Sequence, residues 1–214
     1  MAGVRSFVAV HVAEAALREL DRAVRSLKRA VEGAGLSVSW VPMARQHVTL
    51  KFLGDIEEKE IAGLAGAWRA AIASAQLPEV ELALVGLGAF PTLERPRVLY
   101  GGVADARGGP PASLLVLQQL IEQVAEARGH PREDRPFRPH LTIARVRALR
   151  GPAPLAQIVA PFVGRPFGPP SKVDEIVLYE SRLSPGGPHY IARERIVLSE
   201  RSGSHTDPEG EQTK

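Results

Sequence analysis

The sequence contains no cysteine. This absence excludes a disulfide framework, a thiolate nucleophile, and any zinc or iron–sulfur site with cysteine ligands. It fits a reducing compartment, so we expect a cytoplasmic location. No apolar run approaches the roughly 18 residues that a membrane-spanning helix needs, and the N-terminal residues lack the basic and apolar segments of a signal peptide. We therefore expect no membrane partner.

Aromatic residues are also scarce, at 5% of the chain against 44% for all apolar residues. The core must therefore be built from aliphatic side chains and alanine. A length of 214 residues suits one large domain or two small lobes. The net charge of +3 helps an anionic substrate without identifying one. The sequence has no Gly-rich phosphate loop, Gly-x-Ser-x-Gly elbow or His-Glu-x-x-His helix.

Apolar periodicity predicts both helices and strands along the chain. Helices are expected at 13–34, 56–75, 114–128 and 155–159, and strands at 6–12, 38–41, 47–53, 80–90, 97–103, 140–146, 172–183 and 189–198. Gly54 is expected to end its strand, and Asp55 with Glu58 to cap the helix that follows. Because strands often follow one another directly, the pattern favours an α+β fold with largely antiparallel sheets.

The domain boundaries follow from where the apolar residues stop. We expect residues 1–200 to form a single domain. Residues 201–214 contain almost no apolar side chain, so we expect a disordered tail there.

One short motif occurs twice, 93 positions apart. His47-Val-Thr-Leu50 returns as His140-Leu-Thr-Ile143. In a strand the histidine and threonine of each copy share one face, and the two apolar residues share the other. A lone histidine is more often structural than catalytic, and His11 is interpreted in that way. Two matching copies instead indicate a duplicated half with two-fold pseudo-symmetry, which places two imidazoles across one cleft.

Two imidazoles near neutral pH can divide proton transfer at phosphorus. A neutral histidine accepts a proton from the nucleophile, while a protonated histidine gives a proton to the leaving oxygen. Threonine hydroxyls and basic residues can hold the phosphoryl oxygens. A metal site is the alternative, but neither motif contains an acidic residue. We therefore expect no metal and no cofactor.

The extended motifs resemble those of a known family. The segments His47-Val-Thr-Leu-Lys-Phe-Leu-Gly54 and Arg135-Pro-Phe-Arg-Pro-His-Leu-Thr-Ile-Ala-Arg145 are similar to the two signatures of the two-histidine (2H) phosphoesterases. They are most similar to those of the RNA 2′,3′-cyclic phosphodiesterases, also called 2′-5′ RNA ligases. The resemblance covers about residues 6–198. It implies a bilobal fold of two pseudo-symmetric, mainly antiparallel sheets flanked by helices, with a central cleft.

The resemblance also implies roles for individual residues. His47 would be the proton donor and His140 the proton acceptor, while Thr49, Thr142 and Arg145 would bind substrate. In a regular strand, however, Arg145 would point away from His140. The implied partner is an RNA or nucleotide with a 2′,3′-cyclic phosphate, and we expect a monomer.

Two other functions remain open at this point. A relative of this family could act on another 2′- or cyclic phosphate, such as ADP-ribose cyclic phosphate or 2′-5′ oligoadenylate. Alternatively, the chain could be a non-catalytic RNA-binding module.

Overall fold

The computed structural model describes residues 3–34, 36–149 and 155–198, which form strands and helices in the predicted order. The strands are β1 (Val4–Val10), β2 (Leu36–Trp40), β3 (Val48–Ile56), β4 (Glu81–Phe90), β5 (Val98–Ala104), β6 (His140–Leu149), β7 (Ser171–Lys172), β8 (Glu175–Ser184) and β9 (Gly187–Val197). The α-helices are α1 (Glu14–Gly33), α2 (Glu60–Ser74), α3 (Ala112–Ala127) and α4 (Leu155–Val159). The 155–159 helix is thus confirmed. The predicted tail at 201–214 lies outside the described residues.

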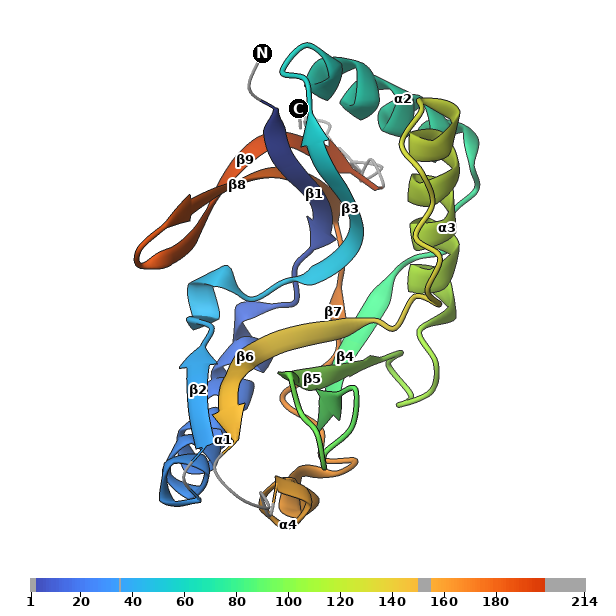
Figure 1. Ribbon diagram of the computed structural model, residues 1–214. Helices are drawn as coiled ribbons and strands as arrows, with labels where there is room; N and C mark the ends of the chain where they lie inside the picture. The colour runs from blue at the N-terminus through green and yellow to red at the C-terminus, as the bar shows by residue number, and fades with distance from the viewer. Residues whose placement is uncertain (1–2, 35, 150–154, 199–214) are drawn as a thin grey trace, which may run out of the picture.

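The strands form two antiparallel groups that meet at a single point. Along the sheet the order is β7-β4-β5-β6-β3-β1-β8-β9. Strand β2 pairs with β6 on the edge that faces away from β5. Between β3 and β6 the pairing is limited to Val48 with Leu141. In Figure 1 the strands curve away from this junction on both sides, giving an upper group with β1, β3, β8 and β9 and a lower group with β2, β4, β5 and β6. The prediction of an α+β, bilobal, antiparallel fold is confirmed.

The Val48–Leu141 pair marks a local two-fold axis. These two residues occupy the same position in the repeated motif, and they pair with each other in antiparallel register. A residue can lie opposite its own equivalent only where a two-fold axis passes between them. The duplicated sequence therefore folds as two halves related by rotation about this junction.

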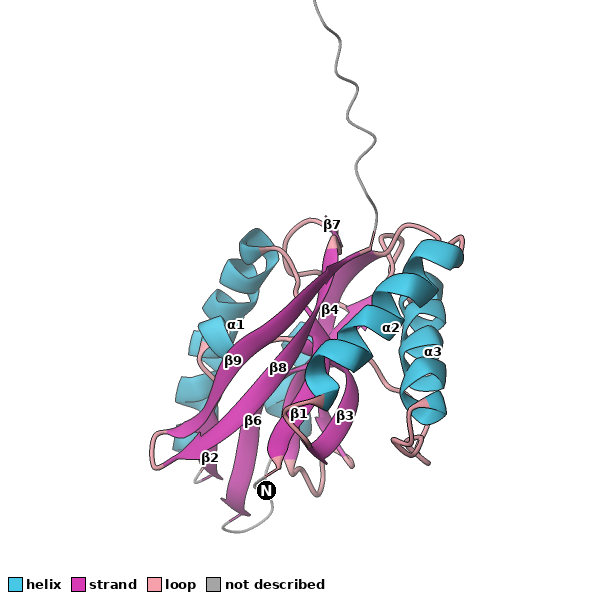
Figure 2. Ribbon diagram, turned by 90° about the horizontal axis from the view of Figure 1, so that it is seen from above, coloured by secondary structure: helices cyan, strands magenta, loops and turns pink. Residues whose placement is uncertain are grey.

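Helices cover the outer faces of both groups. The apolar stripe of α1 is buried, including Leu20, Leu27 and Val31, and this helix packs beside β2 and β4. Helix α2 packs on β9 and on α3, where the buried Trp68 donates a hydrogen bond from Nε1 to the carbonyl of Ile121. Figure 2 shows α1 on one side of the strands and α2 with α3 on the other. As expected from composition, the core is mostly aliphatic.

Two local predictions are wrong at the end of β3. Gly54 does not end the strand, which continues to Ile56. Its φ of 73° lets glycine take the left-handed conformation that an irregular strand needs. Helix α2 begins at Glu60, and Asp55 with Glu58 do not form its cap. Instead the carboxylate of Glu60 accepts a hydrogen bond from the backbone N–H of Glu57.

A buried ion pair anchors the strand that follows the first histidine. The side chains of Lys51 and Glu122 are only 1% and 6% exposed, and Lys51 Nζ lies 2.6 Å from Glu122 Oε2. Lys51 also donates to the carbonyl of Pro131, and Gln118 donates to both Glu122 and the carbonyl of Leu50. Because Pro131 belongs to the segment that leads to His140, this cluster links both motifs to α3.

We expect Lys51→Met to reduce the free energy of unfolding by about 3–5 kcal/mol, because it leaves the Glu122 carboxylate buried without its cation. The double variant Lys51→Met/Glu122→Leu should lose less, since no charge is then stranded. Urea unfolding followed by circular dichroism measures both. Lys59→Met is the matched control, because Lys59 pairs with Glu57 at the surface and is 75% exposed. Equal effects at Lys51 and Lys59 would show that the buried pair has no special role.

Candidate active site

His47 lies immediately before β3, with its ring orientation set by the backbone. Its Nδ1 is 2.9 Å from the carbonyl oxygen of Arg45. A carbonyl can only accept, so Nδ1 carries the proton and Nε2 is left to bind a ligand. The ring stacks on Phe7 with centroids 4.8 Å apart and meets Tyr190 edge-on at 5.2 Å. These contacts fix the imidazole in one position.

His140 opens β6 in the same way. Its Nδ1 is 2.7 Å from the carbonyl oxygen of Arg138, so its Nε2 is likewise the free nitrogen. Phe90 and Tyr100, which stack on each other, both meet the ring edge-on. Arg45 and Arg138 are themselves 93 positions apart. The repeat therefore extends to the carbonyls that hold the two histidines.

Each imidazole is held mainly in its neutral form. Burial is the largest cause, and it lowers the pKa of His47 to about 4 against the opposing hydrogen bond to Arg45. The charges of His11, His140 and Arg145 lower it further. Burial also lowers the pKa of His140, and Arg145 adds to this effect. His140 is thus close enough to lower the pKa of His47, and Arg145 lowers the pKa of both histidines.

The two threonines lie on the same face of the sheet as the two histidines. Val48 and Leu141 are fully buried, so the alternate residues on either side of this pair point the other way. In the antiparallel register His47 falls opposite Thr142, and Thr49 falls opposite His140. The structure therefore brings all four motif residues together around the two-fold axis, as the repeat predicts.

A bulge turns Arg145 toward the histidines. Thr142 pairs with Tyr100 and Ala144 pairs with Leu99, so Ile143 is an extra residue in β6. Ile143 and Ala144 are both fully buried, and the exposed Arg145 returns to the face of His140. The regular-strand expectation that Arg145 points away is wrong for this reason.

His11 is closer to the site than the sequence suggested. Its Nε2 lies 2.7 Å from the hydroxyl of Tyr179, whose ring stacks on Phe7 behind His47. Burial lowers the pKa of His11, and its charge in turn depresses that of His47. His11 therefore belongs to the wall that supports His47, and it is not merely a strand-end residue.

Comparison with known proteins agrees with this geometry. The sequence profile of the 2′-5′ RNA ligase superfamily matches residues 16–184. This chain belongs to that superfamily. It is 33% identical over 211 residues to an RNA 2′,3′-cyclic phosphodiesterase of Thermus thermophilus, covering 94% of this chain and 93% of the relative.

Two further similarities cover more than nine-tenths of this chain. An RNA 2′,3′-cyclic phosphodiesterase of Methanothermobacter thermautotrophicus is 29% identical over 195 residues, which cover 91% of this chain and 99% of the relative. The crystal structure of E. coli LigT complexed with 3′-AMP superposes with a TM-score of 0.67 at 22% identity, covering 92% of this chain and 99% of LigT. The LigT structure supports the fold.

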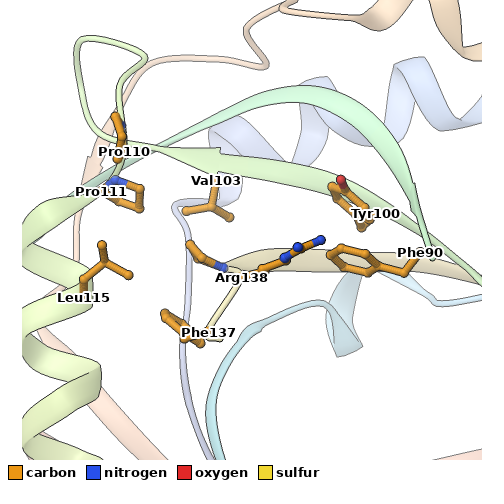
Figure 3. A pocket seen from close by; sticks show the side chains of 9 residues that line it. Phe90, Tyr100, Val103, Pro110, Pro111, Leu115, Phe137 and Arg138 are labelled. Carbon is orange, nitrogen blue, oxygen red and sulfur yellow. The ribbon is translucent and has the colours of Figure 1, made fainter. Parts of the chain in front are cut away.

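An open pocket of about 340 Å³ lies on the His140 side of this superfamily member. Its lining includes Phe90 and Tyr100, the two rings that contact His140, and also Arg138. Figure 3 shows these side chains around the pocket together with residues from the start of α3. The sequence alone does not reveal this pocket, because Phe90 and Pro111 approach the second motif only through the tertiary fold.

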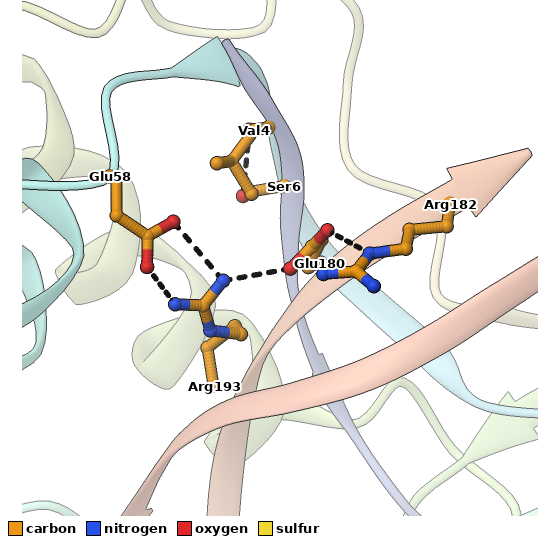
Figure 4. Close-up of polar contacts among 6 residues, drawn as sticks. All are labelled: Val4, Ser6, Glu58, Glu180, Arg182 and Arg193. Carbon is orange, nitrogen blue, oxygen red and sulfur yellow. Dashed lines mark hydrogen bonds and ion pairs between the residues drawn. The ribbon is translucent and has the colours of Figure 1, made fainter. Parts of the chain in front are cut away.

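The arginines at the far edge of the upper group are already paired. Glu180 accepts hydrogen bonds from Arg182 and Arg193, and Arg193 also binds Glu58 just before α2, as Figure 4 shows. Arg145 has no ion-pair partner among the residues that the structure describes. Its guanidinium is therefore available to an anion near the histidines.

Two further features bear on ligands and location. In the described parts of the chain, no three or more His, Asp and Glu side chains are arranged to hold a metal ion. No helix there is long and apolar enough to cross a membrane.

We expect Arg145→Gln to raise the pKa of both His47 and His140, because it removes a positive charge that disfavours each imidazolium. Titration of the histidine ring protons by NMR measures this directly, with His47 of the parent protein titrating at about pH 4. Arg147→Gln is the matched control, since Arg147 lies on the same strand and binds Ser39. If Arg145→Gln leaves both values unchanged, Arg145 does not face the histidines.

Proposed function

We propose that this chain hydrolyses RNA 2′,3′-cyclic phosphate ends to 2′-phosphomonoesters by two-histidine acid–base catalysis without a metal. The observation that carries the proposal is the pair of imidazoles around one two-fold axis. In each of them Nδ1–H donates a hydrogen bond to a backbone carbonyl, and Nε2 is free. Membership of the 2′-5′ RNA ligase superfamily and the names of the relatives support the substrate class.

The reaction needs a base and an acid on opposite sides of phosphorus. Nε2 of His140 accepts a proton from water as the water oxygen forms a bond to phosphorus. The bond from phosphorus to the 3′-oxygen breaks, its electron pair stays on that oxygen, and Nε2–H of protonated His47 supplies the proton. The product has a 2′-phosphate and a 3′-hydroxyl. Exchange with solvent returns each histidine to its starting state.

The substrate itself supplies the charge that the acid requires. In the free protein both pKa values are lowered, so both histidines are neutral near pH 7. A bound phosphodiester anion favours an imidazolium beside it and raises the pKa of the histidine that it contacts. One proton is thus taken up with the substrate, and the second histidine remains a base.

The direction of proton transfer is the part of the proposal that the free protein does not favour. The pKa of His47 is lowered strongly, which by itself would suit a base. We assign His47 as the acid because its motif matches the donor position of the two-histidine family, and because the anion changes the balance on binding. The leaving-group experiment below decides between the two assignments.

Thr49, Thr142 and Arg145 would bind the phosphoryl group. Each threonine lies opposite the histidine of the other motif. From there its hydroxyl can donate a hydrogen bond to a nonbridging phosphate oxygen. Arg145 would stabilise the negative charge that grows on those oxygens in the transition state.

The same groups also suit ligation. If an RNA 5′-hydroxyl replaces water as the nucleophile, the product is a 2′-5′ linkage. We further propose that the chain acts as a monomer, because one chain supplies both halves of the site. A cytoplasmic location stays a prediction.

The direct test is a product assay on a short RNA with a 2′,3′-cyclic phosphate end. We expect a 2′-phosphomonoester at an unchanged rate in EDTA, because the proposed acid and base are both side chains. ADP-ribose cyclic phosphate and 2′-5′ oligoadenylate should react more slowly under the same conditions. Loss of turnover in EDTA with recovery in zinc would refute the metal-free mechanism. Binding of the RNA without turnover would identify a non-catalytic module.

His47→Ala and His140→Ala should each slow hydrolysis by about 10²–10⁴-fold, the usual contribution of a positioned acid or base. A nitrophenyl phosphodiester, whose leaving group needs no proton, separates the roles. His47→Ala should recover much of its rate on that substrate, and His140→Ala should not, because water still lacks its base. Recovery by His140→Ala alone would reverse the assignment. Near-normal activity of either variant on RNA would remove the mechanism.

A further inference from the structure

A second arginine lies near Arg145 on β6, and the proposed chemistry does not use it. Arg147 is exposed, and it has no carboxylate partner among the residues that the structure describes. Its Nη2 instead donates a hydrogen bond of 3.3 Å to the hydroxyl of Ser39. A single exposed arginine is ordinary on a protein surface. Whether this one matters depends on the face that it reaches and on the charges around it.

The hydrogen bond to Ser39 places the Arg147 guanidinium on the histidine face of the sheet. Ser39 on β2 pairs with Arg145 on β6, so these two side chains share one face. The neighbours of Ser39 along its strand, Val38 and Trp40, pack against the core on the other face. Because Arg145 lies on the histidine face, the group that binds Ser39 reaches that face too.

Arg147 and Ser39 form a pair of hydrogen-bond donors one step beyond Arg145. Residues two apart on a strand are separated by about 7 Å, close to the length of one nucleotide in an extended single strand. In Figure 1, β6 runs beside β2 away from the junction of the two groups. A guanidinium binds phosphate through two parallel hydrogen bonds, and the serine hydroxyl has a proton to donate. The pair therefore suits a second phosphate, one nucleotide away from the reacting phosphate.

The upper group of strands has no counterpart of this pair. Arg147 is 93 positions after Gly54, so the equivalent place in β3 carries no side chain. The strand that holds Ser39 also lacks an equivalent, because β3 pairs with β1 and β6 alone among the described strands. A second phosphate can thus be held on one side of the two-fold axis. This difference gives a nearly symmetric site a single direction for a nucleic-acid chain.

We propose that Arg147 and Ser39 form a subsite for the phosphate on the 5′ side of the nucleotide that bears the cyclic phosphate. This inference rests on the proposed function and narrows its substrate to a polynucleotide. An RNA end has a phosphodiester at that position, whereas a cyclic mononucleotide without a 5′-phosphate has no group there. Because the subsite contacts a phosphate that does not react, its contribution is to bind and orient the chain.

The test compares substrates with and without this phosphate. Adenosine 2′,3′-cyclic phosphate lacks it, the 5′-phosphorylated form carries it as a monoester, and the dinucleotide ApA with a 2′,3′-cyclic phosphate end carries it as a diester. We expect Arg147→Gln to lower kcat/KM for the last two by about 5- to 20-fold, between an exposed ion pair and a charged hydrogen bond. Adenosine 2′,3′-cyclic phosphate should react at nearly the parent rate. Arg147→Lys should restore part of the loss.

The salt dependence gives an independent readout. On a longer single-stranded RNA with the same cyclic end, kcat/KM should fall as salt rises, because cations on the protein compete with the counterions of the RNA. In Arg147→Gln the slope of log kcat/KM against log salt should be shallower by about 0.7, as expected for one lost phosphate contact. An unchanged slope would contradict the subsite.

Arg22→Gln is the matched control, because it removes the same charge from an α1 side chain that is 68% exposed and pairs with Glu19. An equal loss on all three substrates in Arg147→Gln, no loss on any, or the same loss in Arg22→Gln would overturn the subsite and leave the proposed function intact. A parent protein that hydrolyses none of the substrates would overturn both. Thermal unfolding of Arg147→Gln should match the parent, since the side chain is exposed.

Discussion

The site depends on one antiparallel pair, Val48 with Leu141. Because the two residues are equivalent in the repeat, their pairing requires a two-fold axis, and that axis brings His47 and His140 to the same face of the sheet. Both side chains are fully buried, so a register shift by one residue would move every polar motif residue to the core face. Burial of the Val48 and Leu141 side chains thus fixes which face of the sheet carries the two histidines.

The two halves differ at two adjacent positions that follow the same bulge. Lys51 occupies the position equivalent to Ala144, and Phe52 that of Arg145. The first difference is structural, because Lys51 reaches a buried carboxylate on α3, whereas Ala144 is covered by the core. The second difference lies on the exposed face, where one half carries an aromatic ring and the other a guanidinium.

Much of this arrangement could be predicted from sequence. The two motifs, their alternating faces and the apolar stripe of α1 follow from local periodicity, which needs no knowledge of partners. The direction of Arg145 could not be predicted, because the bulge at Ile143 depends on pairing with β5 and leaves no mark in the alternation of a single strand. The Lys51–Glu122 pair joins residues 71 positions apart, and nothing local distinguishes Glu122 from the surface carboxylates of a helix.

The electrostatics of the free site follow from the same packing. The rings that fix His47 and His140 also remove water from them, so rigid positioning and a lowered pKa have one cause. Arg145 acts in the same direction, since a cation beside two imidazoles opposes their protonation. In the proposed mechanism a bound phosphodiester anion would oppose this effect, because its negative charge favours an imidazolium beside it. Proton uptake would then accompany substrate binding, and the acid would form only in the complex.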